Sequence, residues 1–356
     1  MTAYKHIGGS VIFVDPCAPR AYTPSCIDKA RLGGTEATLL KIATALSRRA
    51  RIVVHQKHRR ETAAEGRIQY RPFENARSLR RDADHIVVIN SWKVALSIRK
   101  AHPDVPISLW LHVIPGRHNR DMGLRLRNAG IPIVCVSESH AASLRAFLRS
   151  ADSALPEIMA IHNPVADDLM PDSTVRDANL LLFASAPHKG LSEVLQIFQT
   201  IRLQMPSLRL EIADPGYLAW RTCVWPQGTR ALGKLSHAAL MTRMRSALCL
   251  FYPQTSFAET FGLVIAEANA VGTPALLHAG LGANEEVASS TEQCVDGSDP
   301  EAVAATIRQW QNRFPIISGQ ARFRLAAVVE RWWNHIEPRS AVDVPDHETV
   351  CGRPPF

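Results

Sequence analysis

The feature that most constrains this chain is an alternation of short apolar runs with amphipathic stretches, which continues through almost all of its 356 residues. Near-continuous apolar runs are typical of parallel strands that helices cover on both faces. The strands expected in the first half are Val11–Asp15, Arg51–His55, His85–Asn90, Ile107–His112 and Ile131–Val136. Those expected in the second half are Leu180–Ala184, Leu208–Ala213, Leu248–Pro253 and Pro274–Leu277. The expected helices are Glu36–Arg49, Leu191–Met205, Ala238–Ser246, Phe261–Val271 and Pro300–Phe314.

Two such series predict two doubly wound α/β domains, in line with a chain too long for one ordinary domain. A stretch with proline and aspartate at residues 163–177 separates the series. We therefore place the first domain at residues 1–165 and the second at 166–320. Folds of this kind bind ligands at the carboxyl ends of their strands, so two facing domains would share one cleft. Residues 337–356, with four prolines and no apolar periodicity, predict a loose tail.

Composition excludes several classes of protein. Hydrophobic residues make up 46% of the chain and charged residues 21%, which is globular composition. No apolar run approaches the roughly 20 residues that cross a bilayer, and the start lacks the pattern of a secretory signal. The seven cysteines form no C-x-x-C pair, which disfavours zinc ribbons and disulfide scaffolds. We expect a soluble protein of the cytoplasm.

The net charge of +8 is unevenly distributed. Residues 1–165 carry 25 Lys and Arg against 13 Asp and Glu, whereas the remainder carries 16 against 20. A basic half attracts an anionic partner, such as phosphates, an acidic glycan, a membrane face or nucleic acid. Clusters such as Arg59-Arg60 and Arg80-Arg81 are equally compatible with solvated helix ends.

The segment Phe251–Ala275 carries the most chemical information. Glu259 stands just before the expected helix, and Glu267 lies inside it. A carboxylate beside an anion site can accept sugar hydroxyls, and a deeper one can accept ribose hydroxyls, so the spacing suits a nucleotide diphosphate-sugar. The anion site itself would consist of free amides at the helix start. These amides belong to Thr260, Phe261, Gly262 and Leu263.

This segment, continuing through Gly272-Thr273-Pro274, resembles the E-x7-E signature of retaining glycosyltransferases of the GT-B fold, family 4 (group 1). The resemblance implies two facing Rossmann-like domains and a last helix, at 321–336 with Trp332-Trp333, that returns to the first domain. It also implies a glycine loop that contacts the donor diphosphate. Gly33 and Gly34 occupy the position of this loop in the chain. Taken alone, two glycines before a helix indicate only a tight turn.

Two further segments carry the resemblance. Lys189, in the segment Phe183–Leu191, matches a family lysine that pairs with the donor phosphates. Ala184 stands where the family commonly has an arginine, so His188 or a basic residue of the first domain would have to replace it. His112, at the end of an expected strand, matches a histidine near the transferred sugar, although a lone histidine there is more often structural. The base-binding segment would include Leu232 and Gly233, and Ser137-Glu138 also matches.

The resemblance implies a retaining hexosyltransferase that moves sugar from a UDP- or GDP-sugar to a saccharide or lipid-linked acceptor. Cell-surface polysaccharide, lipopolysaccharide or glycolipid synthesis is the expected setting, with possible contact to an anionic membrane face. Catalytic roles fall to His112, Lys189 and Glu259. We expect no metal and no other cofactor, because Asp82-Ala83-Asp84 precedes a strand instead of following one and fits a helix end better.

Two alternatives remain open at this point. A sugar-nucleotide epimerase or hydrolase would keep the fold but needs a dedicated acid/base set, which the second domain does not obviously hold. A basic protein that binds nucleic acid would explain the charge. However, aromatic residues make up only 6% of the chain, and none is interleaved with the basic clusters. Nucleic acid is therefore not an expected partner.

Overall fold

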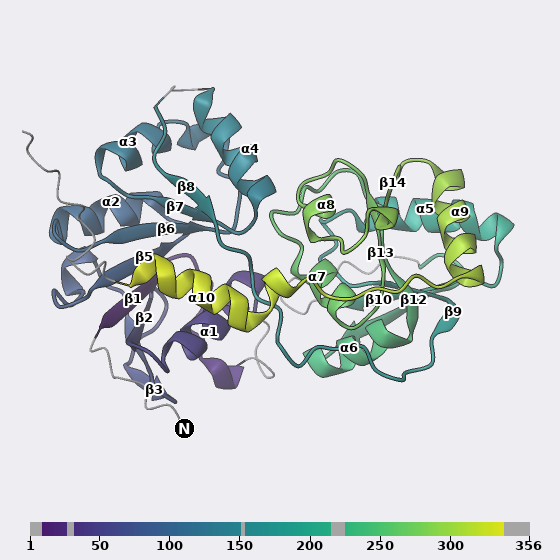
Figure 1. The fold of residues 1–356 in the computed structure, drawn as a ribbon, viewed down its shortest axis with the longest axis horizontal. Coiled ribbons are helices and arrows are strands. Elements are labelled where there is room, and N and C mark those ends of the chain that lie inside the picture. Colours follow the sequence, from purple (N-terminus) through teal and green to yellow (C-terminus); the bar gives the residue numbers. More distant parts are fainter. Residues whose placement is uncertain (1–8, 27–31, 151–153, 215–224, 338–356) are drawn as a thin grey trace, which may run out of the picture.

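The computed structural model describes all residues except 1–8, 27–31, 151–153, 215–224 and 338–356, and it contains two sheets flanked by helices (Figure 1). The tail expected at 337–356 lies, apart from its first residue, outside the described residues. The two predicted parallel-sheet α/β units are confirmed. Within the described residues, no helix is long and apolar enough to cross a membrane.

The first sheet has the strand order β3-β4-β2-β1-β5-β6-β7-β8 and is parallel except for the edge pair β3/β4. Its strands are β1 (Ser10–Asp15), β2 (Arg51–Gln56), β3 (Ala63–Glu65), β4 (Ile68–Pro72), β5 (His85–Ile89), β6 (Ile107–Leu111), β7 (Ile133–Cys135) and β8 (Ile158–Ala160). Its helices are α1 (Gly34–Leu46), α2 (Trp92–Ala101), α3 (Met122–Asn128) and α4 (Glu138–Arg149). The innermost strands are buried at every position, which explains their unbroken apolar runs.

The second sheet is parallel throughout, with the order β11-β10-β9-β12-β13-β14. Its strands are β9 (Asp177–Phe183), β10 (Arg209–Asp214), β11 (Thr229–Lys234), β12 (Ala247–Tyr252), β13 (Ala275–His278) and β14 (Cys294–Val295). Its helices are α5 (Leu191–Gln204), α6 (His237–Ser246), α7 (Leu263–Ala270), α8 (Asn284–Val287) and α9 (Pro300–Asn312). In each sheet the first strand, β1 or β9, lies inside the sheet, and the chain adds strands first on one side of it and then on the other. The loops that leave the carboxyl ends of the strands diverge at this point, which creates a crevice beside the first strand.

The predicted return of the last helix to the first domain is confirmed. Helix α10 (Leu325–Ile336) packs against α1, and in Figure 1 it crosses from the second domain to the first. Trp332 is fully buried against Trp110 of β6, at 4.6 Å between ring centroids. Trp333 is only partly buried and lies under the guanidinium of Arg49. Of the two tryptophans, Trp332 alone belongs to the core.

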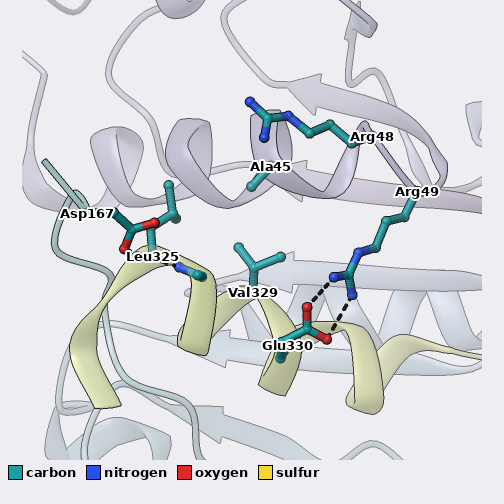
Figure 2. A pocket seen from close by; sticks show the side chains of 8 residues that line it. Ala45, Arg48, Arg49, Asp167, Leu325, Val329 and Glu330 are labelled. Carbon is teal, nitrogen blue, oxygen red and sulfur yellow. Dashed lines mark hydrogen bonds and ion pairs between the residues drawn. The ribbon is translucent and has the colours of Figure 1, made fainter. Parts of the chain in front are cut away.

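Helix α10 also lines a groove of about 310 Å³ with α1 (Figure 2). Ala45 of α1 and Leu325 and Val329 of α10 give it apolar walls. At one end the Arg49 guanidinium pairs with the Glu330 carboxylate. The groove therefore marks the seam between α1 and the returning helix.

Three expectations need correction. Helix α7 begins at Leu263 instead of Phe261, because Gly262 before it adopts φ 83°, in the left-handed region. The residues Asp82-Ala83-Asp84 lie in a turn that leads into β5, not at a helix end, and their carboxylates bind Arg80 and the Ser10 amide. Strands β3, β4, β8, β11 and β14 were not expected, since each lacks a long apolar run.

Candidate functional site

Lys189 and Glu259 meet at the crevice of the second sheet. Lys189 follows β9 and Glu259 follows β12, and these two strands are neighbours in the parallel sheet. The Lys189 Nζ lies 2.9 and 3.0 Å from the two carboxylate oxygens of Glu259. The Glu259 side chain is 8% exposed and that of Lys189 is 23% exposed. Because β9 and β12 are neighbouring parallel strands, the Lys189 ammonium and the Glu259 carboxylate lie at the carboxyl end of the sheet, where such folds bind ligands.

Tyr252 and Gly190 complete the surroundings of this ion pair. The Tyr252 hydroxyl donates a hydrogen bond to Glu259 Oε1 at 3.1 Å. Gly190, which directly follows Lys189, has φ 86°, and a Cβ there would lie 2.4 Å from the Cβ of Gln254. The loop after β9 can therefore lie close to the loop after β12 only with glycine at this position.

Glu267 forms a second polar centre, on α7. It is 5% exposed, and its Oε1 lies 3.1 Å from His237 Nε2 of α6 and 3.6 Å from Lys41 Nζ of α1. Burial opposes ionisation of Glu267, but the hydrogen bond from His237 and the charge of Lys41 outweigh it and hold the pKa below its usual value. The hydrogen bond to Glu267 raises the pKa of His237. Because Lys41 comes from the first domain, this centre spans both domains.

The loop before α7 touches the first domain directly. The Thr260 hydroxyl donates to the His112 carbonyl at 2.8 Å, and the Thr260 carbonyl accepts from the Ser137 hydroxyl at 2.5 Å. Phe261 is buried between the rings of His162 and Phe323. Leu263 is the first helical residue, so its amide has no acceptor within the helix. The predicted amides thus lie at the contact between the domains, with Phe261 serving as an anchor.

His112 lies at the carboxyl end of β6, as predicted. Its backbone amide donates to Asn90 Oδ1 at 2.7 Å, and its ring stacks against Trp110 at 4.5 Å between centroids. Burial, together with the nearby His140, lowers the pKa of His112 to about 3. Its Nε2 is buried and has no hydrogen-bond partner among the described residues. The ring is therefore neutral near pH 7 and offers one nitrogen for a further hydrogen bond.

Glu286 makes a second contact between the domains. It lies on α8, and its carboxylate accepts from the amides of Glu138 and Ser139, which open α4, at 2.9 and 2.8 Å. His162 Nε2 lies 2.7 Å from the same carboxylate. Burial opposes ionisation here too, but these donors lower the pKa of Glu286 to about 2. A carboxylate of one domain thus caps a helix of the other.

Other predicted residues do not reach this site through any contact within the described residues. Gly33 caps α1, and a Cβ there would lie 2.5 Å from Glu36 Oε2. Gly34 opens the helix that carries Lys41 about two turns further on. Leu232 and Gly233 lie on the edge strand β11, and His237 nearby reaches Glu267 instead. The ring of His188 lies against that of Phe257.

Sequence reasoning missed Lys41, His237, Tyr252, Asn90 and Glu286. Lys41, His237, Asn90 and Glu286 act through contacts between distant segments, so no local motif marks them, whereas Tyr252 lies only seven residues before Glu259. Asn90 alone carries a signal, because asparagine after a buried strand can adopt positive φ, and here φ is 54°. No group of three or more His, Cys, Asp or Glu side chains in the described part of the chain is arranged to hold a metal ion.

Known proteins resemble this chain in part of its sequence and in its fold. Residues 175–313 match the family described as glycosyl transferases group 1. No curated protein matches the chain by sequence. Sucrose-phosphate synthase from Thermosynechococcus elongatus superposes with a TM-score of 0.69 at 13% identity, over 92% of this chain and 98% of that one.

Two further structures show the same architecture. A trehalose-6-phosphate protein from E. coli, bound with UDP-2-fluoro glucose, has a TM-score of 0.58 at 13% identity, over 91% of this chain and 93% of its own. AviGT4, a glycosyltransferase involved in avilamycin A biosynthesis, has a TM-score of 0.58 at 16% identity, over 92% and 96%. The fold is therefore that of the GT-B glycosyltransferases. Within it, the match to the group 1 glycosyltransferase family is confined to residues 175–313, which lie in the second domain.

Proposed function

We propose that this protein is a retaining glycosyltransferase that moves a hexose from a UDP- or GDP-sugar to a saccharide or lipid-linked acceptor. The observation that carries the proposal is the Lys189–Glu259 pair at the crevice of a group 1 glycosyltransferase domain. Glu267, buried and kept ionised by His237 and Lys41, supplies the second carboxylate of the motif. Synthesis of a cell-surface polysaccharide or glycolipid is the setting we infer.

Departure of the nucleoside diphosphate limits the rate of such a reaction, so the site must stabilise the negative charge that develops on the phosphates. Lys189 would exchange its partner Glu259 for the diphosphate, and Glu259 would then accept hydroxyls of the sugar. The amides at the start of α7 and the turn at Gly33-Gly34 would add donors. These groups would do so without a metal ion, and Asp82 and Asp84 are engaged with other partners.

Glu267 would accept hydroxyls of the ribose, because its carboxylate lies deeper along α7 than the start of the helix. His112, neutral near pH 7, would form one hydrogen bond to the transferring sugar. The acceptor hydroxyl would enter on the face that the diphosphate leaves, which preserves the anomeric configuration. Substitution should separate the two glutamates: Glu259→Gln should mainly lower kcat, and Glu267→Gln should mainly weaken donor binding, by about 1–3 kcal/mol.

The test is release of UDP or GDP from a panel of nucleotide sugars, with and without saccharide and lipid-linked acceptors. Acceptor-dependent release, with product of retained configuration by NMR, supports the proposal. Release without acceptor indicates a hydrolase, and epimerised donor indicates an epimerase. Activity should persist in EDTA; a loss that manganese reverses would contradict the metal-independent mechanism. Wild-type kinetics in both glutamate variants would contradict the assignment of the site.

A further inference from the structure

The surface after β6 combines exposed apolar and basic side chains. Val113, Ile114 and Leu124 are 51%, 44% and 41% exposed, and they are three of the seven large apolar residues that the described chain exposes. Four exposed arginines share the segment. We call these seven residues the basic–apolar patch: Val113, Ile114, Arg117, Arg120, Leu124, Arg125 and Arg127.

The apolar residues of the patch do not pack into the core beneath α3. On α3, Met122 and Leu126 are buried against the sheet face that α2 and α4 also cover, whereas Leu124 points outward. This face lies opposite the one covered by α1 and α10, and in Figure 1 α3 lies at the edge of the first domain away from both. One side of the short helix α3 is therefore packed on the sheet, and the side that carries Leu124 is exposed to solvent.

Three of the four arginines of the patch are available for an external partner. The side chains of Arg117, Arg120 and Arg127 form no hydrogen bond or ion pair with other described residues. The single acidic side chain of the segment, Asp121, pairs with Arg125 at 2.9 Å. Elsewhere in this domain, Arg59 donates to the Tyr22 carbonyl and Arg80 pairs with Asp82.

The patch is also firmly held beside the candidate site. Val113 directly follows His112, whose amide is bound by Asn90. Further along, Trp92 Nε1 of α2 donates to Asn119 Oδ1 at 2.9 Å, which fixes the turn between the apolar pair and α3. The patch therefore begins at the residue that follows His112 of the candidate site and extends from there to α3.

We propose that the basic–apolar patch docks the protein on an anionic lipid bilayer. Arginines beside exposed aliphatic side chains fit such a surface, because the lipid headgroups attract the charge while the aliphatic groups enter the interface. The excess of basic residues in the first 165 positions has the matching sign. Docking brings a lipid-linked acceptor to the cleft. It needs no donor or turnover, so it stands or falls separately from the transferase activity.

Binding to vesicles of phosphatidylcholine with 30% phosphatidylglycerol tests the proposal with the full chain. We expect sedimentation with these vesicles at 50 mM NaCl, weakening at 300 mM, and little with phosphatidylcholine alone. Arg120→Glu and Arg127→Glu should each raise the Kd about fivefold or more. Leu124→Gln should raise it several-fold at both salt concentrations.

Two matched variants on the second domain serve as controls. Leu203→Gln replaces an exposed leucine of α5, and Arg313→Glu replaces an exposed arginine after α9; neither should change the Kd. Circular dichroism and release of nucleotide from donor with a soluble acceptor should match wild type in all variants. Absence of binding at 50 mM NaCl, equal loss in the controls, or self-association through the patch without vesicle binding would each overturn the proposal.

Discussion

At the scale of single residues, Glu259 and Lys189 form an ion pair in the structure. A substitution at either residue therefore leaves the charge of the other without its partner. The ammonium contacts both carboxylate oxygens, and the Tyr252 hydroxyl donates to Glu259 Oε1. Removing the lysine leaves a nearly buried carboxylate with one neutral donor. An anionic ligand that binds Lys189 must therefore also bring donors, such as sugar hydroxyls, that replace the ammonium at Glu259.

Lys189→Ala should abolish most transfer activity, because Ala184 leaves no arginine in the usual position to bind the phosphates. A loss of at least about 100-fold in kcat/KM, close to 3 kcal/mol, is the expected size for removal of a charge that stabilises the leaving group. Lys100→Ala, at an exposed position of α2, is the matched control and should retain wild-type values. Equal kcat/KM in both variants would contradict the assigned role of Lys189.

His237 should make stability depend on pH. Its folded pKa is raised, first by the hydrogen bond to Glu267, while the charges of Lys41 and Asp168 act in opposite directions. The stabilisation by its protonated form is complete below the ordinary pKa of 6.5 and is lost as pH rises through the higher folded value. The Tm advantage of wild type over His237→Gln should be larger at about pH 6 than at about pH 9. A constant difference across this range would contradict the coupling.

At the scale of elements, α4 depends on a cap from outside its own domain. Its own residue Ser137 accepts from the amide of His140, and Glu286 of α8 accepts from the two preceding amides, those of Glu138 and Ser139. Charged hydrogen bonds of this kind contribute about 1–3 kcal/mol each when buried. The two domains are therefore linked by helix termini as well as by apolar contact.

Glu286→Ala should lower the free energy of unfolding by about 1–3 kcal/mol, because it removes the cap and leaves His162 without its carboxylate partner. Glu292→Ala, an exposed glutamate of the same domain, should change it by less than about 0.5 kcal/mol. Denaturant unfolding near pH 7 measures both. If the two variants prove equally stable, the cap contributes nothing to the pairing of the domains.

The sequence predicted those strands that contain a run of three or more buried apolar residues and those helices that have a clear apolar periodicity. The runs at β1, β5, β6 and β12 are apolar because both of their faces are covered, and helix periodicity marks α1, α5 and α9. Strand β11 is exposed or partly exposed at every position, so no apolar pattern distinguishes it from a loop. The E-x7-E spacing located Glu259 and Glu267, but the contacts of Lys41 and Glu286 arise only when distant elements pack.

At the scale of the whole molecule, one apolar core runs from the first sheet through α10 into the second domain. The connection after β8 and the segment before α10 run side by side: the Val165 amide donates to the Phe323 carbonyl, and the Val165 carbonyl accepts from the Leu325 amide. The cleft is thus flanked by a double crossing of the chain. Helix α10 thereby fastens the end of the described chain to α1 and β6 of the first domain.

Trp332 and Trp333 allow a matched test of this role for α10. Trp332→Ala should destabilise the protein by about 3–5 kcal/mol, because its fully buried ring fills the space against Trp110. It should also split denaturant unfolding into two steps, since the helix couples the domains. Trp333→Ala removes a partly exposed ring and the contact to Arg49, so it should cost about 1 kcal/mol and keep a single transition. Tryptophan fluorescence and circular dichroism should coincide for Trp333→Ala and separate for Trp332→Ala; coincident curves in both would show that α10 does not couple the domains.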